Sequence, residues 1–192
     1  MKRLLSSLAV ASLLVSGVAY ADNYKIDPFH TNARFAIDHF NTSTNVGGFY
    51  GLTGDMTYTA GGQGKLDITI PVDKLQTGSA EFTGHLKSAD LFNAEQHPTM
   101  RFESTKFNYT GKGKTRKLTS VDGNLTLLGK TNPVRLYAKK FNCYQSPMLN
   151  AQVCGGDFST TIDRTKWGMN YLVDVGMTKN VRLDIQVEAV KQ

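Results

Sequence analysis

Apolar and polar residues alternate along most of the chain, which is the pattern of β-strands that bury one face. In the clearest run, from Val181 to Ala189, every second residue is apolar and the residues between them are charged or polar. The same alternation occurs at 33–39 and 65–70, and further strands are predicted at 46–60, 99–110, 117–128, 132–141 and 156–163. We therefore expect eight strands.

Short segments rich in turn residues separate the predicted strands at 61–64, 111–113 and 129–133. Links of this length favour antiparallel hairpins over parallel crossovers. Within 99–110 the apolar phase slips between Phe102 and Phe107. The slip predicts a β-bulge.

One stretch, 77–96, departs from the alternation. Phe82, His85 and Leu86 follow the i, i+3, i+4 spacing of a helix, and Ser79 stands where an N-cap residue is expected. We predict a short helix near 80–87, followed by a tight turn at 90–92.

Eight strands with one apolar face each must hide those faces from water. A sandwich does so, and so does a closed barrel, which also removes the exposed sheet edges. An eight-stranded barrel is wide enough either to be filled by its own side chains or to hold one small ligand. The periodicity alone leaves both alternatives open.

The first 21 of the 192 residues have the pattern of a cleaved secretory signal peptide. Lys2 and Arg3 precede an apolar stretch at 4–18, and Ala19-Tyr20-Ala21 is a cleavage site of the A-x-A type. The remaining residues, 22–192, are predicted to form a single domain. No later apolar run approaches the roughly 20 residues that a membrane-spanning helix needs. We expect export to the periplasm, and secretion beyond the outer membrane stays open.

The two cysteines, Cys143 and Cys154, are separated by ten residues. An even count at short spacing in an exported protein predicts a local disulfide, and no C-x-x-C redox motif is present. We expect the bridge to pin an irregular connection at 144–153.

The charge is moderately basic, with 22 Lys and Arg against 16 Asp and Glu. A surplus of this size does not make a nucleic-acid-binding protein by itself. The densest basic run, at 112–117, is expected to be a solvated hairpin tip, or else a weak contact with a membrane surface.

Motifs for catalysis or metal binding are missing. The chain has no H-E-x-x-H, G-x-S-x-G, P-loop or strand-linked GxGxxG motif, and its four histidines are scattered. His30 and His39 could meet a carboxylate in space, which keeps a metal site open. Asp163 and Arg164, close to Trp167, are expected to form a local ion pair beside a packed aromatic ring. No catalytic residue and no metal ligand is predicted.

A set of short motifs resembles the YceI-like family of periplasmic proteins. The motifs are 26–31 (IDPFHT), 35–39 (FAIDH), 47–49 (GGF), 52–54 (LTG), 75–78 (LQTG), 85–92 (HLKSADLF), 97–102 (HPTMRF), 123–131 (GNLTLLGKT), 133–134 (PV) and 162–164 (IDR). Their order and spacing cover essentially all of 24–190.

The resemblance implies an all-β fold, an eight-stranded antiparallel lipocalin-like barrel with a short helical insertion and a long apolar cavity. It also implies binding of polyisoprenoid chains, including the tails of isoprenoid quinones such as ubiquinone, and no shared enzymatic centre. The sequence departs from the family at Phe82-Thr83, where an Arg-Asp pair is frequent, and in the loop between the two cysteines. A polar anchor that depended on the Arg-Asp pair is therefore not expected here.

The residues predicted to bind the ligand are aliphatic and aromatic, because burying a polyprenyl tail requires no charge. Those predicted to line the cavity are Phe35, Ile37, Phe49, Leu52, Met56, Ile68, Ile70, Met100, Phe102, Leu125, Leu127, Phe158 and Ile162. Those predicted to form the mouth or a lid are Phe82, Leu86, Leu91 and Phe92. Headgroup contacts are assigned to His30, His39 and His85. Trp167 is assigned to the cavity and is also a candidate hydrogen-bond donor to the headgroup.

Three functions are therefore weighed. The first is a periplasmic carrier that sequesters an isoprenoid lipid or quinone. The second is a metal- or stress-linked periplasmic enzyme that uses His30 and His39. The third is a ligand-free barrel that acts as an interaction module through its basic hairpin. A homodimer stays open, and no nucleic-acid partner is expected.

Overall fold

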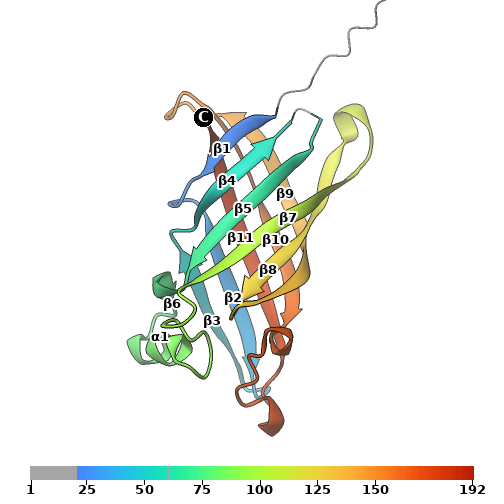
Figure 1. Ribbon diagram of the computed structural model, residues 1–192. Coiled ribbons are helices and arrows are strands. Elements are labelled where there is room, and N and C mark those ends of the chain that lie inside the picture. The colour runs from blue at the N-terminus through green and yellow to red at the C-terminus, as the bar shows by residue number, and fades with distance from the viewer. Residues whose placement is uncertain (1–20, 60) are drawn as a thin grey trace, which may run out of the picture.

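The computed structural model describes residues 21–59 and 61–192, so all but the last residue of the predicted signal peptide lies outside the described part (Figure 1). The strands are β1 Asp22–Ile26, β2 Asn32–His39, β3 Ser43–Tyr50, β4 Thr53–Tyr58, β5 Gly64–Pro71, β6 Leu75–Gln76, β7 Thr99–Thr110, β8 Lys117–Leu127, β9 Lys130–Gln145, β10 Gln152–Asp163 and β11 Asn180–Lys191. The helices are α1 Ala80–Lys87 and four short 3₁₀ turns, η1 Val72–Lys74, η2 Gly113–Thr115, η3 Arg164–Trp167 and η4 Val173–Val175.

The strands form one antiparallel sheet that closes on itself as a barrel, which confirms the predicted fold class. Eight strands make the closed circuit, in the order β1-β4-β5-β7-β8-β9-β10-β11 and back to β1. The other three, β2, β3 and β6, extend this circuit at one end. There β2 pairs with the first half of β11, while β1 pairs with its last residues, so β1 and β2 share one position in the barrel.

The closed circuit has the expected eight strands, but the described residues form eleven strands in all, because one predicted strand is two and β1 and β6 were not predicted. The predicted strand at 46–60 is interrupted at Gly51, whose positive φ of 65° turns the chain between β3 and β4. Strand β1 was not predicted, because only two of its five residues, Tyr24 and Ile26, face the core. Such a short segment shows too little alternation to be recognised.

Two local predictions from the pattern are confirmed. The register between β7 and β8 shifts between Ser104 and Lys106, inside the interval where the apolar phase slips. Helix α1 begins after Ser79, whose hydroxyl accepts a hydrogen bond from the backbone N–H of Phe82 at 3.2 Å.

The predicted disulfide between Cys143 and Cys154 is also confirmed. The bridge does not lie in an irregular connection, however, because β9 and β10 extend further than predicted and the two cysteines stand directly opposite each other in the ladder. The cross-strand bridge therefore joins two regular strands near their hairpin.

Aromatic side chains close one end of the barrel. Strands β4 and β9 lie on opposite sides of the eight-strand circuit, yet the rings of Tyr58 and Phe141 are only 5.5 Å apart between their centroids. Phe107 packs beside Tyr58, and the hydroxyls of Tyr58 and Tyr109 are 3.1 Å apart. Rings that meet across the interior leave no passage, so the barrel is filled at this end.

The opposite end is built differently. There α1, the hairpin between β2 and β3, and the segment 164–179 gather around the ends of the strands (Figure 1). Among the residues that the structure describes, no helix has the length and apolarity to cross a membrane.

Candidate ligand-binding cavity

An apolar cavity occupies the barrel interior between the aromatic end and α1. Of the 25 residues that line it, 24 are hydrophobic, and Arg164 is the exception. The centre of a water molecule can reach about 140 Å³ of the cavity, and the space between the lining atoms amounts to about 1200 Å³ when the part open to solvent is included. The larger figure lies somewhat above the range of about 300–1,000 Å³ for small-molecule sites, because it includes space open to solvent.

Strand periodicity points the lining side chains inward. On β5 the lining residues Leu66, Ile68 and Ile70 alternate with side chains on the outer face, and Val121, Leu125 and Leu127 do the same on β8. Both strands therefore contribute aliphatic groups to the same interior space.

Two of the lining phenylalanines lie across glycines on a neighbouring strand. A Cβ atom at Gly123 would collide with the ring of Phe102, and one at Gly47 would collide with the ring of Phe35. The two glycines thus allow both rings to lie against the barrel wall. A larger residue at either glycine would push an aromatic ring into the cavity.

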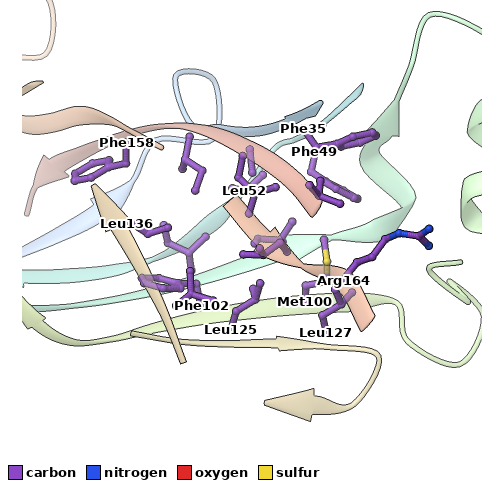
Figure 2. A pocket seen from close by; sticks show the side chains of 18 of the residues that line it. Phe35, Phe49, Leu52, Met100, Phe102, Leu125, Leu127, Leu136, Phe158 and Arg164 are labelled. Atoms are coloured by element: carbon purple, nitrogen blue, oxygen red, sulfur yellow. The ribbon is translucent and has the colours of Figure 1, made fainter. Parts of the chain in front are cut away.

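Most of the residues predicted from the sequence to bind the ligand lie in this lining, and Figure 2 shows many of them converging on one space. They are Phe35, Ile37, Phe49, Leu52, Ile68, Ile70, Leu86, Phe92, Met100, Phe102, Leu125, Leu127, Phe158 and Ile162. The lining also contains residues that the sequence analysis did not assign to it, namely Ala33, Leu66, Val121, Val134, Leu136, Arg164, Met169, Val181, Leu183, Ile185 and Val187. Strand β11 was recognised from its alternation, and the same signal would have placed its apolar face in the cavity.

Four predicted residues lie outside the lining. Met56 is buried beside Tyr24, its register partner on β1. Trp167 is buried, and its indole N–H donates to the carbonyl of Leu125 at 2.9 Å, so this polar group is already satisfied within the protein. Leu91 is buried and Phe82 half-buried, and both pack in the core cluster near α1.

The histidines assigned to headgroup contacts are dispersed around the barrel and none lines the cavity. The Nδ1 atom of His30 lies 2.7 Å from Asp27 Oδ2, and this hydrogen bond raises the pKa of His30. His39 packs edge-to-face on Phe40, and His85 of α1 packs edge-to-face on Tyr171.

The structure does not bring His30 and His39 together. His30 precedes β2 and His39 ends it. At about 3.3 Å per residue an eight-residue strand spans roughly 25 Å. Within 21–59 and 61–192, no group of three histidine, cysteine or acidic side chains is arranged to hold a metal ion.

Arg164 has an unusual environment for a charged residue. It is 3% exposed, and its guanidinium donates to the backbone carbonyls of Met169, Tyr171 and Thr178 at 2.8–3.1 Å. Burial lowers the pKa of Arg164. In Figure 2 its stem lies beside Met100 and Leu127 while the guanidinium points away from the apolar side chains.

The predicted ion pair between Asp163 and Arg164 is wrong. Asp163 faces outward, where its carboxylate contacts Lys179 at 3.3 Å and accepts hydrogen bonds from Thr165. Arg164 follows at the end of β10 and projects inward. Consecutive residues of an extended chain point to opposite faces, so the two charges are separated by the barrel wall.

A closed antiparallel barrel of eight positions, filled at one end and holding an apolar cavity, defines a lipocalin-like barrel protein. More particularly, the chain belongs to the YceI-like family, because the family model described as YceI-like domain matches residues 24–189.

Relatives in sequence span the whole chain. A protein of Pseudomonas aeruginosa named UPF0312 protein is 32% identical over 198 residues, covering 100% of both chains. One from Pectobacterium carotovorum with the same type of name is 34% identical over 196 residues, covering 100% of this chain and 98% of the relative.

Solved structures share the fold at lower identity. The Campylobacter jejuni YCEI protein is 22% identical, with a TM-score of 0.64 over 81% of this chain and 90% of that chain. A polyisoprenoid binding domain from Saccharophagus degradans is 12% identical, with a TM-score of 0.62 over 88% of this chain and 98% of that domain. At these identities the likeness concerns the fold.

Proposed function

We propose that this protein is a periplasmic carrier that holds the tail of an isoprenoid lipid, either a polyprenyl lipid or an isoprenoid quinone such as ubiquinone, in its barrel cavity. The observation that carries the proposal is the lining, with 24 hydrophobic residues of 25 and an aromatic barrier at one end. Such a site recognises a long hydrocarbon by shape and apolar surface. The polyisoprenoid binding domain from Saccharophagus degradans, which has the same fold, supports this choice of ligand.

The energetics favour sequestration without chemistry. A tail that gives up about 400 Å² of apolar surface gains about 10 kcal/mol at about 25 cal/mol per Å², before the costs of association and ordering. No charged group has to be buried with it. Binding, rather than catalysis, is therefore the proposed activity of the chain.

In this proposal the tail enters from the α1 end and the headgroup remains at the mouth. Each nitrogen of the Arg164 guanidinium already donates to a backbone carbonyl, so this group is held within the 164–179 segment. Near the open end, His85 and its neighbour Tyr171 are placed to contact a headgroup, whereas His30 is not. The predicted signal peptide supports a periplasmic location.

The direct test is to purify the mature protein without detergent, extract it with organic solvent and identify any lipid by mass spectrometry. We expect a polyprenyl or quinone species in a stoichiometric amount. Ile37→Asp, which places a carboxylate in the lining, is expected to lose it, while Val46→Asp on the exposed outer face of β3 is expected to retain it. Repeated recovery of an empty protein that also fails to take up added quinone would contradict the proposal.

A further inference from the structure

The open end of the barrel ends in a small apolar surface, which we call the mouth tip and define as Phe40, Tyr171, Leu172 and Val175. All four side chains are exposed, and Val175 is the most exposed of them at 66%. They come from two turns distant in sequence, the β2–β3 hairpin and the 164–179 segment, which reach the same end of the molecule in Figure 1. The ring of Phe40 lies beside Gly176, so the two turns are in contact.

Two residues of the mouth tip have strained backbone conformations. Phe40 and Leu172 have positive φ angles of 55° and 58°, a region that bulky residues rarely occupy. Asn or Gly would serve each turn with less strain. Two large apolar side chains instead stand in strained turns facing water, which folding alone does not explain.

The mouth tip is also held firmly. Arg164 donates to the carbonyl of Tyr171, a mouth-tip residue, and to those of Met169 and Thr178, which lie before and after the exposed residues of the 164–179 segment. Tyr171 also packs against His85 of α1, with ring centroids 5.1 Å apart. A buried arginine thus fixes the base of a turn whose apex is apolar.

The mouth tip adjoins the end of the cavity that lies nearest α1. Met169 and Arg164 line the cavity at the start of the same segment that carries Leu172 and Val175, and Leu86 lines it from α1. A partner that covers the mouth tip is therefore positioned where, in the proposed function, the ligand enters or leaves. The other end is filled by aromatic rings and offers no passage.

From these observations we infer that the mouth tip docks on the surface of a lipid bilayer, inserting Leu172 and Val175 among the lipids so that an apolar ligand passes between membrane and cavity without crossing water. This inference deepens the proposed function and rests on it. The charge pattern indicates how the surface binds. The only charged residue at 170–177 is Asp174, so docking depends on apolar insertion and requires no anionic lipid.

The closed end provides matched controls for this orientation. Met148 in the β9–β10 hairpin is 92% exposed, so it is an apolar residue at least as accessible as any in the mouth tip. The basic run 112–117 lies in the β7–β8 hairpin, also away from the mouth, and docking through it would require anionic lipid and weaken with salt.

The experiment is co-sedimentation of the purified mature protein with vesicles of phosphatidylcholine alone and of phosphatidylcholine mixed with phosphatidylglycerol. We expect the wild type to bind both. The double variant Leu172→Asp/Val175→Asp is expected to bind at least about tenfold more weakly, because withdrawing one aliphatic side chain from an apolar environment already has an effect of that size. Met148→Asp and Lys114→Glu are expected to bind neutral vesicles as the wild type does.

Three results would overturn the inference. The first is equal vesicle binding by the wild type and the double variant. The second is binding that appears only with phosphatidylglycerol and is lost in Lys114→Glu, which would assign docking to the basic hairpin. The third is a wild type that binds neither vesicle, including the case in which it forms a dimer that the double variant breaks.

Lipid retention separates this inference from the proposed function. Leu172 and Val175 are not among the lining residues, so the double variant purified without detergent should keep the same extractable lipid as the wild type. Vesicle binding by a wild type that contains and takes up no isoprenoid would contradict the proposed function alone. Retained lipid without vesicle binding would contradict the docking inference alone.

Discussion

Filling part of the cavity should weaken ligand binding strongly and destabilise the empty protein only slightly. Val121 is well placed for this test, because it lines the cavity from β8 and is 1% exposed. In Val121→Phe the added ring atoms enter the cavity, where they occupy the space proposed for the tail. In an ordinary filled core the same change forces neighbouring side chains apart and costs about 1–3 kcal/mol.

The size of the effect follows from the empty space. A cavity of about 140 Å³ costs about 3 kcal/mol at about 24 cal/mol per Å³. The ring atoms added in Val121→Phe fill only part of this space and recover about 1 kcal/mol, against an overpacking cost of about 1–3 kcal/mol. The free energy of unfolding should therefore stay unchanged or fall by at most about 2 kcal/mol. At roughly 2–4 °C per kcal/mol, the melting temperature falls by at most about 8 °C.

Ligand binding should change much more. A ring that displaces one five-carbon unit of the tail removes about five buried carbons at about 0.8 kcal/mol each. The resulting loss of about 4 kcal/mol weakens binding about a thousandfold. The assays are thermal and urea unfolding of the delipidated protein and a titration with a fluorescent or radiolabelled quinone. Val46→Phe, the same substitution on an exposed strand position, is the matched control and should change the free energy of unfolding by less than about 0.5 kcal/mol.

One combination of results would refute this reasoning. If Val121→Phe lost more than about 2 kcal/mol of stability, the site would be behaving as a filled core. If it also bound quinone like the wild type, the tail would not occupy the cavity. The opposite combination, retained stability with lost binding, distinguishes a ligand cavity from a packing defect.

Three further predictions concern the closed end, the outer surface and the mouth. Replacing Cys143 and Cys154 with serine should lower the free energy of unfolding, measured by urea titration, by about 3 kcal/mol. Lipid retention should stay intact, because neither cysteine lines the cavity. An unchanged urea midpoint would contradict the first expectation. The hydrogen bonds from Arg135 hold the pKa of Asp122 below its usual range, so the stabilisation is present above about pH 4 and is lost as the pH falls through the lowered value. Asp122→Asn should be less stable than the wild type at pH 7 and should lose less stability between pH 5 and pH 2, and parallel pH profiles would disprove the coupling. Arg164→Met keeps an apolar stem in the lining but removes three hydrogen bonds to backbone carbonyls, and a hydrogen bond to a charged group contributes about 1.5–3 kcal/mol. Amide hydrogen exchange at 169–178 should therefore accelerate at least tenfold. Unchanged exchange would show that other contacts hold the segment.

The alternation of residues carried most of the information about the fold. It located seven of the strands from alternating runs such as 181–189. In such a strand the residues that face the interior are apolar and those that face water are polar, so the sequence shows the alternation directly. Strand β1 was missed because its five residues show too little alternation. The segment 46–60 was predicted as one strand because the turn at Gly51 is encoded by backbone conformation more than by polarity.

The candidate site was predictable to the same extent and for the same reason. Inward-facing residues of a barrel line its interior, so assigning Ile68 or Leu125 to the lining required only the strand phase. Trp167 and Met56 illustrate the limit. Both are apolar and buried, but whether a buried residue faces a cavity or packs behind its wall depends on neighbours from distant strands.

By itself, the sequence determined a single antiparallel β-fold, its helical insertion, its disulfide and the apolar character of its interior. These follow from local rules, namely the period of two, the N-cap and the cysteine spacing. Only the tertiary structure decided that Tyr58 meets Phe141 across the barrel and closes one end, that Arg164 binds carbonyls instead of Asp163, and that Phe40 and Val175 reach the same end. The first and the last depend on contacts between residues far apart in the chain, which form only once the sheet has closed. The second depends on how 164–179 folds over the end of the barrel, with the Arg164 side chain enclosed by its own segment.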